Sequence, residues 1–299
     1  MKVTITGNSG FVAKNLIKYL KSYHEINSLS IRYRFNQTFG FNSEAVIHLA
    51  GLSSHLKKVS DPCEYYEANR ELTKQLFDYF LNSEASVFIF MSTVKAVADS
   101  VAGILTEESI PNPKTHYGIA KHQAEEYILS KSLPMGKRVY ILRPCMIHGP
   151  GNKGNLNLLY QLVSKGLPWP LGSFKNQRSF LSIENLCFVI KELLENDEIP
   201  SGIYQVADNE PVSTNDLIQI IAQSLDTKNW VLNIPASSIK MIARLGDYLH
   251  LPLNTECLQK LTENYVVSNH KIIKVMGKEL PISTEEGLLK TFQSFRHAQ

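Results

Sequence analysis

Short apolar runs alternate with helix-like patterns through the first half of the chain. The runs have the length of strands and lie at 2–6, 28–32, 45–51, 86–92 and 138–144. Between them, apolar residues recur at the spacing of a helix with one buried face. Strands that are apolar throughout and separated by helices are typical of a parallel sheet covered on both faces. We therefore predict a doubly wound α/β domain whose ligands bind at the carboxyl edge of the sheet.

The second half of the chain is less regular, and its pattern predicts a smaller domain. Helical spacing occupies 155–165, 184–195 and 214–225, and one more strand-like run lies at 202–207. We expect residues 1–150 to form the first domain, residues 178–207 to return to it, and residues 151–299 to form the smaller C-terminal domain.

Composition and charge exclude several classes of function. The 299 residues are 43% hydrophobic and 20% charged, which is globular composition with enough apolar residues for a large core. The net charge of +3 is spread along the chain, so we expect neither nucleic acid nor a membrane surface as a partner. The apolar runs are too short to span a bilayer, so we expect no membrane partner. The four cysteines are far apart, so we expect neither a disulfide framework nor a metal site. We also expect the protein to lie in the cytoplasm.

A glycine-rich turn joins the first predicted strand to the first predicted helix. Glycines in such a turn let the backbone approach a pyrophosphate, and the free N–H groups at the start of the helix attract its negative charge. The turn therefore predicts a dinucleotide-binding site, with the candidate cofactor contacts Gly7, Ser9, Gly10, Phe11 and Val12.

The residues after the second predicted strand bear on the choice between NAD and NADP. An acidic residue about 20 positions after the glycine turn would bind the ribose hydroxyl groups of NAD. The strand instead ends in SIRYR, which contains Arg32. An arginine there can hold the extra phosphate of NADP, or it can be a solvated side chain at the edge of the sheet. Both cofactors stay open, with Arg32 as a candidate contact.

The stretch THYGIAKHQAEEYILSK holds two Tyr-x-x-x-Lys pairs, Tyr117 with Lys121 and Tyr127 with Lys131. Residues i and i+4 share one helix face, where an ammonium group can favour the phenolate form of a tyrosine. The two pairs lie too far apart along a helix to serve one site. Tyr117 stands near the predicted start of the helix, at the carboxyl edge of the sheet, whereas Tyr127 lies deep in the helix beside apolar residues. Tyr117 and Lys121 are therefore the candidate catalytic pair.

Two hydroxyl groups complete this candidate site. Ser92 and Thr93 stand at the carboxyl end of the preceding predicted strand, so their side chains reach the same edge. A hydroxyl that donates to a carbonyl or alkoxide oxygen, a tyrosine that passes the proton and a lysine that tunes it form a set for redox chemistry between a carbonyl and an alcohol. We predict Tyr117, Lys121, Thr93 and Ser92 as catalytic.

These motifs together resemble the extended short-chain dehydrogenase/reductase family, the nucleotide-sugar epimerases and dehydratases. The resemblance covers nearly the whole chain and rests on TGNSGFVAKNL, HLAG at 48–51, YGIAK, LRPCMIHGPG at 142–151 and RSFLSIENL at 178–186. It implies a Rossmann-type doubly wound parallel sheet with a smaller C-terminal domain that binds a nucleotide-sugar substrate. Thr93 falls on the family's catalytic Ser/Thr position, and Tyr117 and Lys121 fall on its catalytic pair.

The resemblance also implies further contacts. The matched cofactor positions are Leu49, Ala50, Gly51, Asn69, Lys121 and Pro144. Arg178 matches the arginine that contacts the nucleotide diphosphate, although by residue type alone it is a surface arginine. Asn155 is a further candidate for the substrate side, together with Thr93. The family pairs its helices near 62–82 and 116–131 across a two-fold axis, which implies a homodimer.

Similarity at 92–97 and 151–179 is to the branch that acts on UDP-N-acetylhexosamines and their 4-keto-6-deoxy derivatives in surface-polysaccharide pathways. It implies an NAD(P)-dependent 4-epimerase that acts on a UDP-linked (N-acetyl)hexosamine by transient oxidation at C4. One alternative is an NADPH-dependent reductase of 4-keto-6-deoxy-sugar nucleotides. An alternative of another class is a non-catalytic protein of this fold that senses the cofactor.

Overall fold

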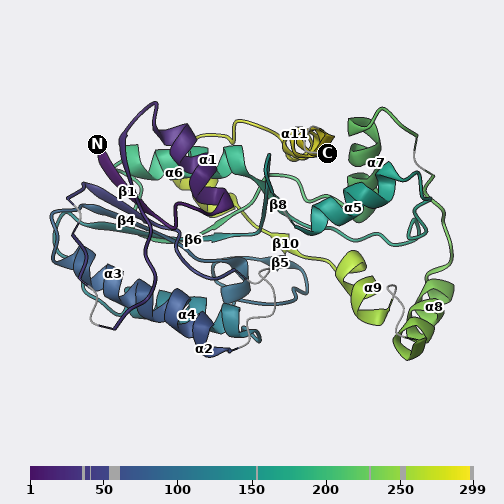
Figure 1. The fold of residues 1–299 in the computed structure, drawn as a ribbon, viewed down its shortest axis with the longest axis horizontal. Coiled ribbons are helices and arrows are strands. Elements are labelled where there is room, and N and C mark those ends of the chain that lie inside the picture. The colour runs from purple at the N-terminus through teal and green to yellow at the C-terminus, as the bar shows by residue number, and fades with distance from the viewer. Residues whose placement is uncertain are drawn as a thin grey trace.

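The strand pattern folds as one parallel sheet in the computed structural model, which describes residues 1–35, 38–40, 42–53, 61–152, 154–228, 230–249 and 254–296. Within those ranges the sheet contains β1 (Lys2–Thr6), β2 (Glu25–Leu29), β3 (Ala45–His48), β4 (Val87–Met91), β6 (Arg138–Pro144) and β9 (Gly202–Val206). Their order is β2-β1-β3-β4-β6-β9, and every neighbouring pair is parallel (Figure 1).

Helices cover both faces of this sheet. Helices α1 (Phe11–Leu20) and α6 (Ile183–Glu195) lie on one face, and α3 (Leu72–Leu81) and α4 (His116–Leu129) lie on the other (Figure 1). In β4, Val87 and Ile89 belong to the core beneath α1 and α6, whereas Phe88 and Phe90 belong to the core beneath α3 and α4. Because successive strand residues point to opposite faces, an apolar strand can bury all of its side chains. The predicted doubly wound α/β fold is confirmed.

The second strand begins earlier than the sequence suggested. We expected it at 28–32, but β2 runs from Glu25 to Leu29, and this prediction is wrong by three residues. Its register is set by pairing with β1, from Lys2 opposite Glu25 to Thr6 opposite Leu29, and not by its own apolar content. Arg32 consequently stands three residues beyond the strand and is exposed.

The helical segment after Asp61-Pro62 contains a feature that the periodicity does not predict. It consists of α2 (Cys63–Tyr66), a π-helical turn η1 (Glu67–Glu71) and then α3. Asn69 lies in the π-helical turn and is fully buried. Such turns widen a helix by one residue and are frequent at functional sites.

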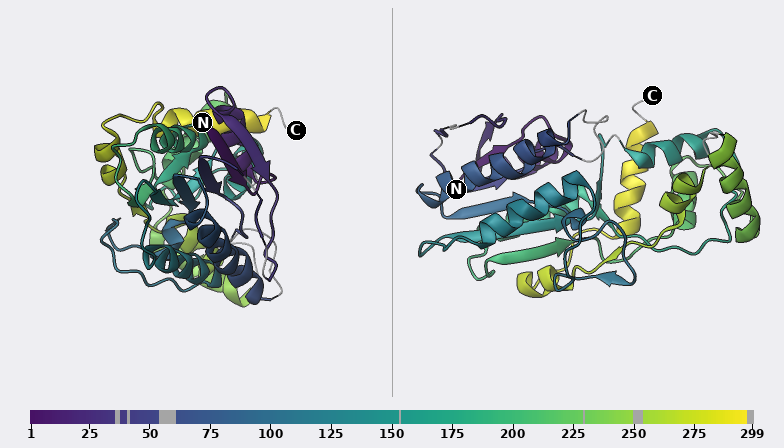
Figure 2. Two further views of the ribbon diagram at one scale, coloured as in Figure 1. Left: turned by 90° about the vertical axis from the view of Figure 1, so that its left-hand side faces the viewer. Right: turned by 90° about the horizontal axis from the view of Figure 1, so that it is seen from below.

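A second hydrophobic cluster forms in the later part of the chain. It includes side chains from α5 (Asn155–Ser164), α7 (Thr214–Ser224), α8 (Ala236–Leu249), α9 (Thr255–Thr262) and α11 (Thr284–Arg296). In the right-hand view of Figure 2, α11 stands between the sheet and the other helices of this cluster. Within the described ranges, no helix has the length and apolarity needed to cross a membrane.

The chain returns to the first core more than once. Helix α6 and strand β9 pack there, and so do residues of β10 (Val266–Val267) and α10 (His270–Met276), a second return that we did not predict. Small elements connect the two clusters: β10 pairs with β5 (Ile104–Leu105), and β7 (Met146–His148) pairs with β8 (Phe180–Ser182).

A line of buried hydrogen bonds ties two strands to the helical segment. The Thr6 hydroxyl accepts from the backbone N–H groups of Leu49 and Ala50, at 3.2 and 3.1 Å, and donates to His48 Nδ1 at 2.8 Å. His48 Nε2 lies 3.0 Å from the Thr73 hydroxyl, which itself donates to the Asn69 carbonyl oxygen. Since the Thr73 proton is already used, His48 Nε2 is the donor. Burial lowers the pKa of His48 to about 3, so the ring is neutral when folded.

The neutral His48 makes the stability of the protein depend on acidity. In the unfolded chain this histidine takes up a proton below its ordinary pKa of 6.5, whereas in the folded protein it does not until about pH 3. Stability contributed by the neutral ring is therefore complete above pH 6.5 and falls as the pH is lowered, by about 1.4 kcal/mol per pH unit. His48→Gln should be less stable than wild type at pH 7.5 but lose less stability between pH 6 and pH 4, measured by urea unfolding. Parallel losses in the two proteins would contradict this assignment.

Candidate active site

The glycine turn approaches β3 so closely that only glycine fits at its first position. Gly7 has φ +74°, and a Cβ atom there would lie 2.8 Å from both the nitrogen and the Cα atom of Ala50. The Gly10 N–H donates to the Gly7 carbonyl oxygen at 3.0 Å, which closes the turn just before α1 begins at Phe11. Ser9 and Gly10 are exposed at this turn. The turn thus has the open backbone surface at a helix start that a diphosphate requires.

A second close approach lies beside the turn. A Cβ atom on Gly51 would overlap Asn69 Oδ1 and would lie 3.5 Å from Lys121 Nζ. The Asn69 amide donates to the Leu52 carbonyl oxygen at 3.1 Å, while its Oδ1 atom is buried and has no hydrogen-bond partner among the described residues. A buried acceptor without a partner is rare in proteins. The Asn69 oxygen beside Gly51 fits a bound group with a hydrogen-bond donor.

The predicted catalytic tyrosine lies at the start of α4. Thr115 caps this helix by accepting from the Gly118 N–H at 3.2 Å, which puts Tyr117 in its first turn. Thr93 follows Ser92 just after β4 and caps the short 3-10 helix η2 (Val94–Ala96), and its hydroxyl is near enough to Tyr117 to act on the pKa of that tyrosine. Burial raises the pKa of Tyr117 to about 12, against the effect of Thr93, which lowers it. The structure therefore brings Thr93 and Tyr117 together at the carboxyl edge of the sheet.

Lys121 lies one turn after Tyr117 and points beneath it into the protein. Its ammonium group donates to the Met91 carbonyl oxygen at 2.8 Å and lies 4.7 Å from the centre of the Phe90 ring. Burial lowers the pKa of Lys121 to about 7, and the charge of Glu125 acts in the opposite direction. We expected Lys121 to lower the pKa of Tyr117, but in this structure the ammonium group is bound to Met91 and the pKa of Tyr117 is raised.

Ser92 belongs to a different set of contacts from Thr93. Its hydroxyl donates to Glu125, which is buried in α4 and is also held by Arg143 through Nε to Oε1 at 3.0 Å and Nη2 to Oε2 at 2.6 Å. Burial alone would raise the pKa of Glu125, but His122, whose Nδ1 atom lies 3.7 Å from the carboxylate, and hydrogen bonds from Arg143 and Ser92 hold it below its ordinary value. Ser92 therefore positions the end of β4 against α4, and its proton is already donated.

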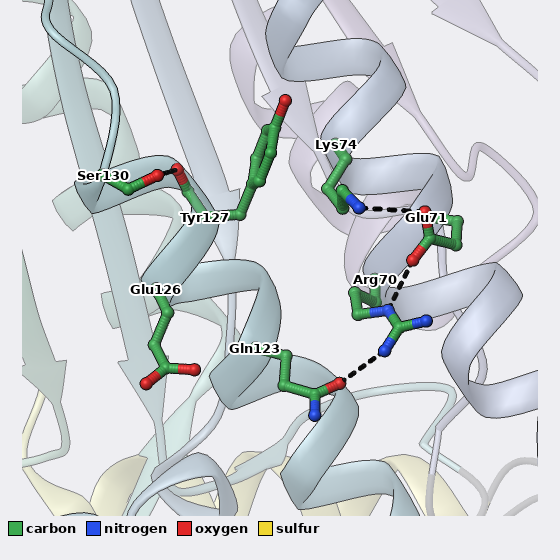
Figure 3. A pocket seen from close by; sticks show the side chains of 7 residues that line it. All are labelled: Arg70, Glu71, Lys74, Gln123, Glu126, Tyr127 and Ser130. Atoms are coloured by element: carbon green, nitrogen blue, oxygen red, sulfur yellow. Dashed lines mark hydrogen bonds and ion pairs between the residues drawn. The ribbon is translucent and has the colours of Figure 1, made fainter.

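Tyr127, the tyrosine of the second Tyr-x-x-x-Lys pair, lies in the helix layer formed by α3 and α4 (Figure 3). The Tyr127 hydroxyl donates to the Asp78 carboxylate at 2.7 Å, so it joins α4 to α3, and Lys131 Nζ lies 4.6 Å from the centre of its ring. Burial, followed by this hydrogen bond to Asp78, raises the pKa of Tyr127. This tyrosine has a structural contact and is remote from the carboxyl ends of the strands.

Comparison with known proteins shows the family of this chain. The family model described as "NAD dependent epimerase/dehydratase family" matches residues 3–207. The chain belongs to this family. As an NAD(P)-dependent enzyme of the epimerase/dehydratase family, it has NAD or NADP as its cofactor, as the sequence predicted.

Individual relatives of this epimerase/dehydratase cover nearly its whole length. A UDP-glucose 4-epimerase from Vibrio cholerae is 28% identical over 99% of this chain and 96% of its own. An N-acetyl-alpha-D-glucosaminyl-diphospho-ditrans,octacis-undecaprenol 4-epimerase from Escherichia coli O157:H7 is 26% identical over 99% of this chain and 96% of its own. Among solved structures, MoeE5 in complex with UDP-glucose and NAD superposes with a TM-score of 0.75 at 17% identity, over 100% of this chain and 99% of its own. That likeness shows the shared fold.

The other residues that we predicted as contacts lie in separate parts of the structure. Pro144 ends β6 beside Val206 of β9, close in sequence to Arg143. Arg178 donates to the Lys260 carbonyl oxygen at 2.5 Å, and its Nη2 atom lies 3.8 Å from Glu263. Asn155 begins α5, but its side chain lies outside the part of the chain that the structure describes.

Glu125 is the site residue that we did not identify from the sequence. The signal was present, since Tyr117, Lys121 and Glu125 recur at i, i+4 and i+8 and so share one helix face. A glutamate is ordinarily a surface residue, and a sequence does not show that an arginine 18 positions later will meet it.

Replacing Glu125 should lower the free energy of unfolding of the protein. Glu125→Gln leaves the Arg143 charge buried without a carboxylate, which costs about 3–5 kcal/mol in the free energy of unfolding. The neighbouring Glu126 has a side chain that is 64% exposed, so Glu126→Gln should change that free energy by less than about 0.5 kcal/mol. Urea unfolding of the two variants tests the difference, and equal stability would show that the buried pair is not important for folding.

Proposed function

We propose that the protein is an NAD(P)-dependent nucleotide-sugar 4-epimerase that acts on a UDP-linked (N-acetyl)hexosamine. The observation that carries this proposal is the placement of Thr93, Tyr117 and Lys121 together at the sheet edge where the glycine turn lies. A sugar hydroxyl placed against these two oxygens can lose its proton to Tyr117. The Vibrio cholerae relative, named a UDP-glucose 4-epimerase, supports the assignment to C4 chemistry.

Residues of this chain have separate roles in the chemistry at C4. Tyr117 takes the proton of the 4-hydroxyl group and returns it, while Thr93 donates to the same oxygen and holds it in place. With a pKa of about 12, Tyr117 needs a nearby cation to act near neutral pH, and Lys121 supplies that charge when its ammonium group turns from the Met91 carbonyl oxygen. Glu125 favours the charged form of Lys121.

The cofactor and the substrate are held by different parts of the chain. Bound NAD(P) supplies the acceptor and donor of hydride at C4. Gly7 and Gly10 would hold its diphosphate, and Asn69 and Gly51 would border the part next to Lys121. We assign the substrate diphosphate to Arg178, which would exchange its present partners in α9 for phosphate oxygens, because a guanidinium fork pairs well with phosphate. Residues 151–299 would thus supply most of the substrate contacts, and Asn155 stays a prediction.

A reductase is the alternative that keeps the same site. The GDP-6-deoxy-D-mannose reductase of Pseudomonas aeruginosa is 25% identical over 79% of this chain and 84% of its own. Arg32 is exposed beyond β2, where it could meet the phosphate that distinguishes NADP from NAD. A reductase would consume NADPH at each turnover, whereas an epimerase would reuse its cofactor. The non-catalytic alternative is disfavoured by the paired Thr93 and Tyr117.

A second candidate substrate for the same C4 chemistry is a sugar carried on a polyprenyl diphosphate. The Escherichia coli relative is named for such a substrate and matches 99% of this chain. The reacting sugar and the diphosphate are shared with a UDP-sugar, so the catalytic residues would be unchanged. Either substrate fits a cytoplasmic enzyme that prepares sugars for surface polysaccharides.

We also propose that the enzyme is a homodimer through the helices near 62–82 and 116–131. Helices α3 and α4 lie side by side on one face of the sheet, and the turn η1 that precedes α3 is joined to α4 by the hydrogen bond from Arg70 to Gln123 at 2.9 Å (Figures 1 and 3). Their outer surface carries both charges, with Arg70 and Lys74 beside Glu71. Such a surface can meet its own copy across a two-fold axis with opposite charges facing.

The two Tyr-x-x-x-Lys pairs offer a matched test of the catalytic assignment. Tyr117→Phe removes the proton carrier and should lower turnover of UDP-sugars about 10²–10⁴-fold. The variant should still retain NAD(P), identified by mass spectrometry of the nucleotide released on denaturation. Tyr127→Phe removes the same atom from a surface contact and should leave turnover unchanged. Full activity in Tyr117→Phe would refute the assignment.

A further inference from the structure

One helix presents apolar side chains to solvent at the far end of the molecule. In α8, five large side chains are exposed, and we call them the α8 apolar face: Met241 at 68%, Ile242 at 45%, Leu245 at 57%, Tyr248 at 82% and Leu249 at 52%. They lie within an arc of about 120° around the helix. Contiguous apolar surface of this kind marks a site of interaction in a folded protein.

This face is not the one that holds the helix to the protein. Ile239, Ala243 and Gly246 are the buried residues of α8, and they lie on an adjacent arc. A surface helix normally has a single apolar stripe, which faces the core. Helix α8 is therefore apolar on two sides, one of which already packs on its own protein.

The charges of α8 favour an anionic partner. Lys240 and Arg244 are exposed and lie on the arc that borders Tyr248. Asp247 is turned toward α9, where its carboxylate accepts from the Thr255 N–H at 3.0 Å and from the Thr255 hydroxyl. The acid of α8 thus caps a neighbouring helix, and the two cations stand beside the apolar face.

The position of α8 connects this face to the proposed substrate site. Figures 1 and 2 show α8 at the end of the molecule farthest from the sheet, next to α9. Helix α9 in turn holds Arg178, through the Lys260 carbonyl oxygen. A surface that α8 contacts would therefore lie on the side of the substrate diphosphate, remote from the glycine turn.

We propose that α8 docks the enzyme on an anionic lipid bilayer, lying in the plane of the surface with its apolar face among the headgroups. A basic, amphipathic helix with exposed Met, Leu and Tyr side chains has the composition of an interfacial helix. The sequence led us to expect no membrane partner, because its charge is spread along the chain and no segment can span a bilayer. A helix that lies in the interface does not need that length, and the fold places Lys240 and Arg244 beside one apolar face. The proposal goes beyond the C4 chemistry and does not depend on it.

Vesicle flotation of the full-length protein tests the proposal. Wild type should float with vesicles of phosphatidylglycerol and phosphatidylethanolamine, and less so at high salt or with phosphatidylcholine alone. Leu245→Glu with Leu249→Glu should lower the bound fraction about tenfold, and Lys240→Gln with Arg244→Gln should weaken binding and reduce its salt dependence. Met135→Glu, at a fully exposed methionine outside α8, is the matched control and should bind like wild type.

Several results would overturn the proposal. The proposal is wrong if the wild-type protein does not float with anionic vesicles, or if the α8 variants float as well as wild type. It is also wrong if wild type binds phosphatidylcholine vesicles as well as it binds anionic vesicles. If the α8 variants instead convert a wild-type oligomer to a smaller species by light scattering, the face is covered by a second copy. Melting temperature and turnover of a UDP-sugar without lipid are measured in parallel and should be unchanged in the α8 variants. If the wild-type protein does not turn over a UDP-sugar, that result counts against the proposed function and not against the docking of α8.

Discussion

The ion pair between Glu125 and Arg143 is the contact on which the catalytic site depends. It joins α4, which carries Tyr117 and Lys121, to the carboxyl end of β6, and the Ser92 hydroxyl brings the end of β4 to the same carboxylate. Burying two charges is unfavourable unless the geometry is good and the remaining lone pairs are satisfied, and here both carboxylate oxygens are bonded. The helix is thereby held in one rotation, which presents the tyrosine beside Thr93.

A second constraint acts on the cofactor side. The backbone of the glycine turn touches β3 at Ala50, and the line from Thr6 through His48 and Thr73 links that strand to the π-helical turn of Asn69. These contacts are polar, buried and directional, so they fix positions that apolar packing alone would leave adjustable. The two constraints converge at Lys121, which is close to Gly51 on one side and interacts with Glu125 on the other.

Most of the sheet could be predicted from the sequence, because β4 is apolar throughout, the centre of β6 is apolar, and helices flank both strands. The start of β2 could not, because EINSL is a polar edge strand whose register is set by β1. The π-helical turn leaves the apolar spacing of α3 unchanged, so periodicity does not show it. The burial of Glu125 and the partners of Arg178 could not be predicted, because they depend on contacts between residues far apart in the chain. The exposure of the α8 apolar face could not be predicted either, because its residue types are those of a buried helix face.

Conversion of a C4-deuterated substrate tests the central claim most directly. UDP-N-acetylglucosamine with deuterium at C4 is incubated with the purified enzyme without added NAD(P) or NAD(P)H. The product is analysed by NMR and mass spectrometry. A 4-epimerase yields the 4-epimer with deuterium retained at C4, because the atom removed from one face is returned to the other within one site. Conversion that requires added NADPH, or a product with hydrogen at C4, would contradict the proposed function.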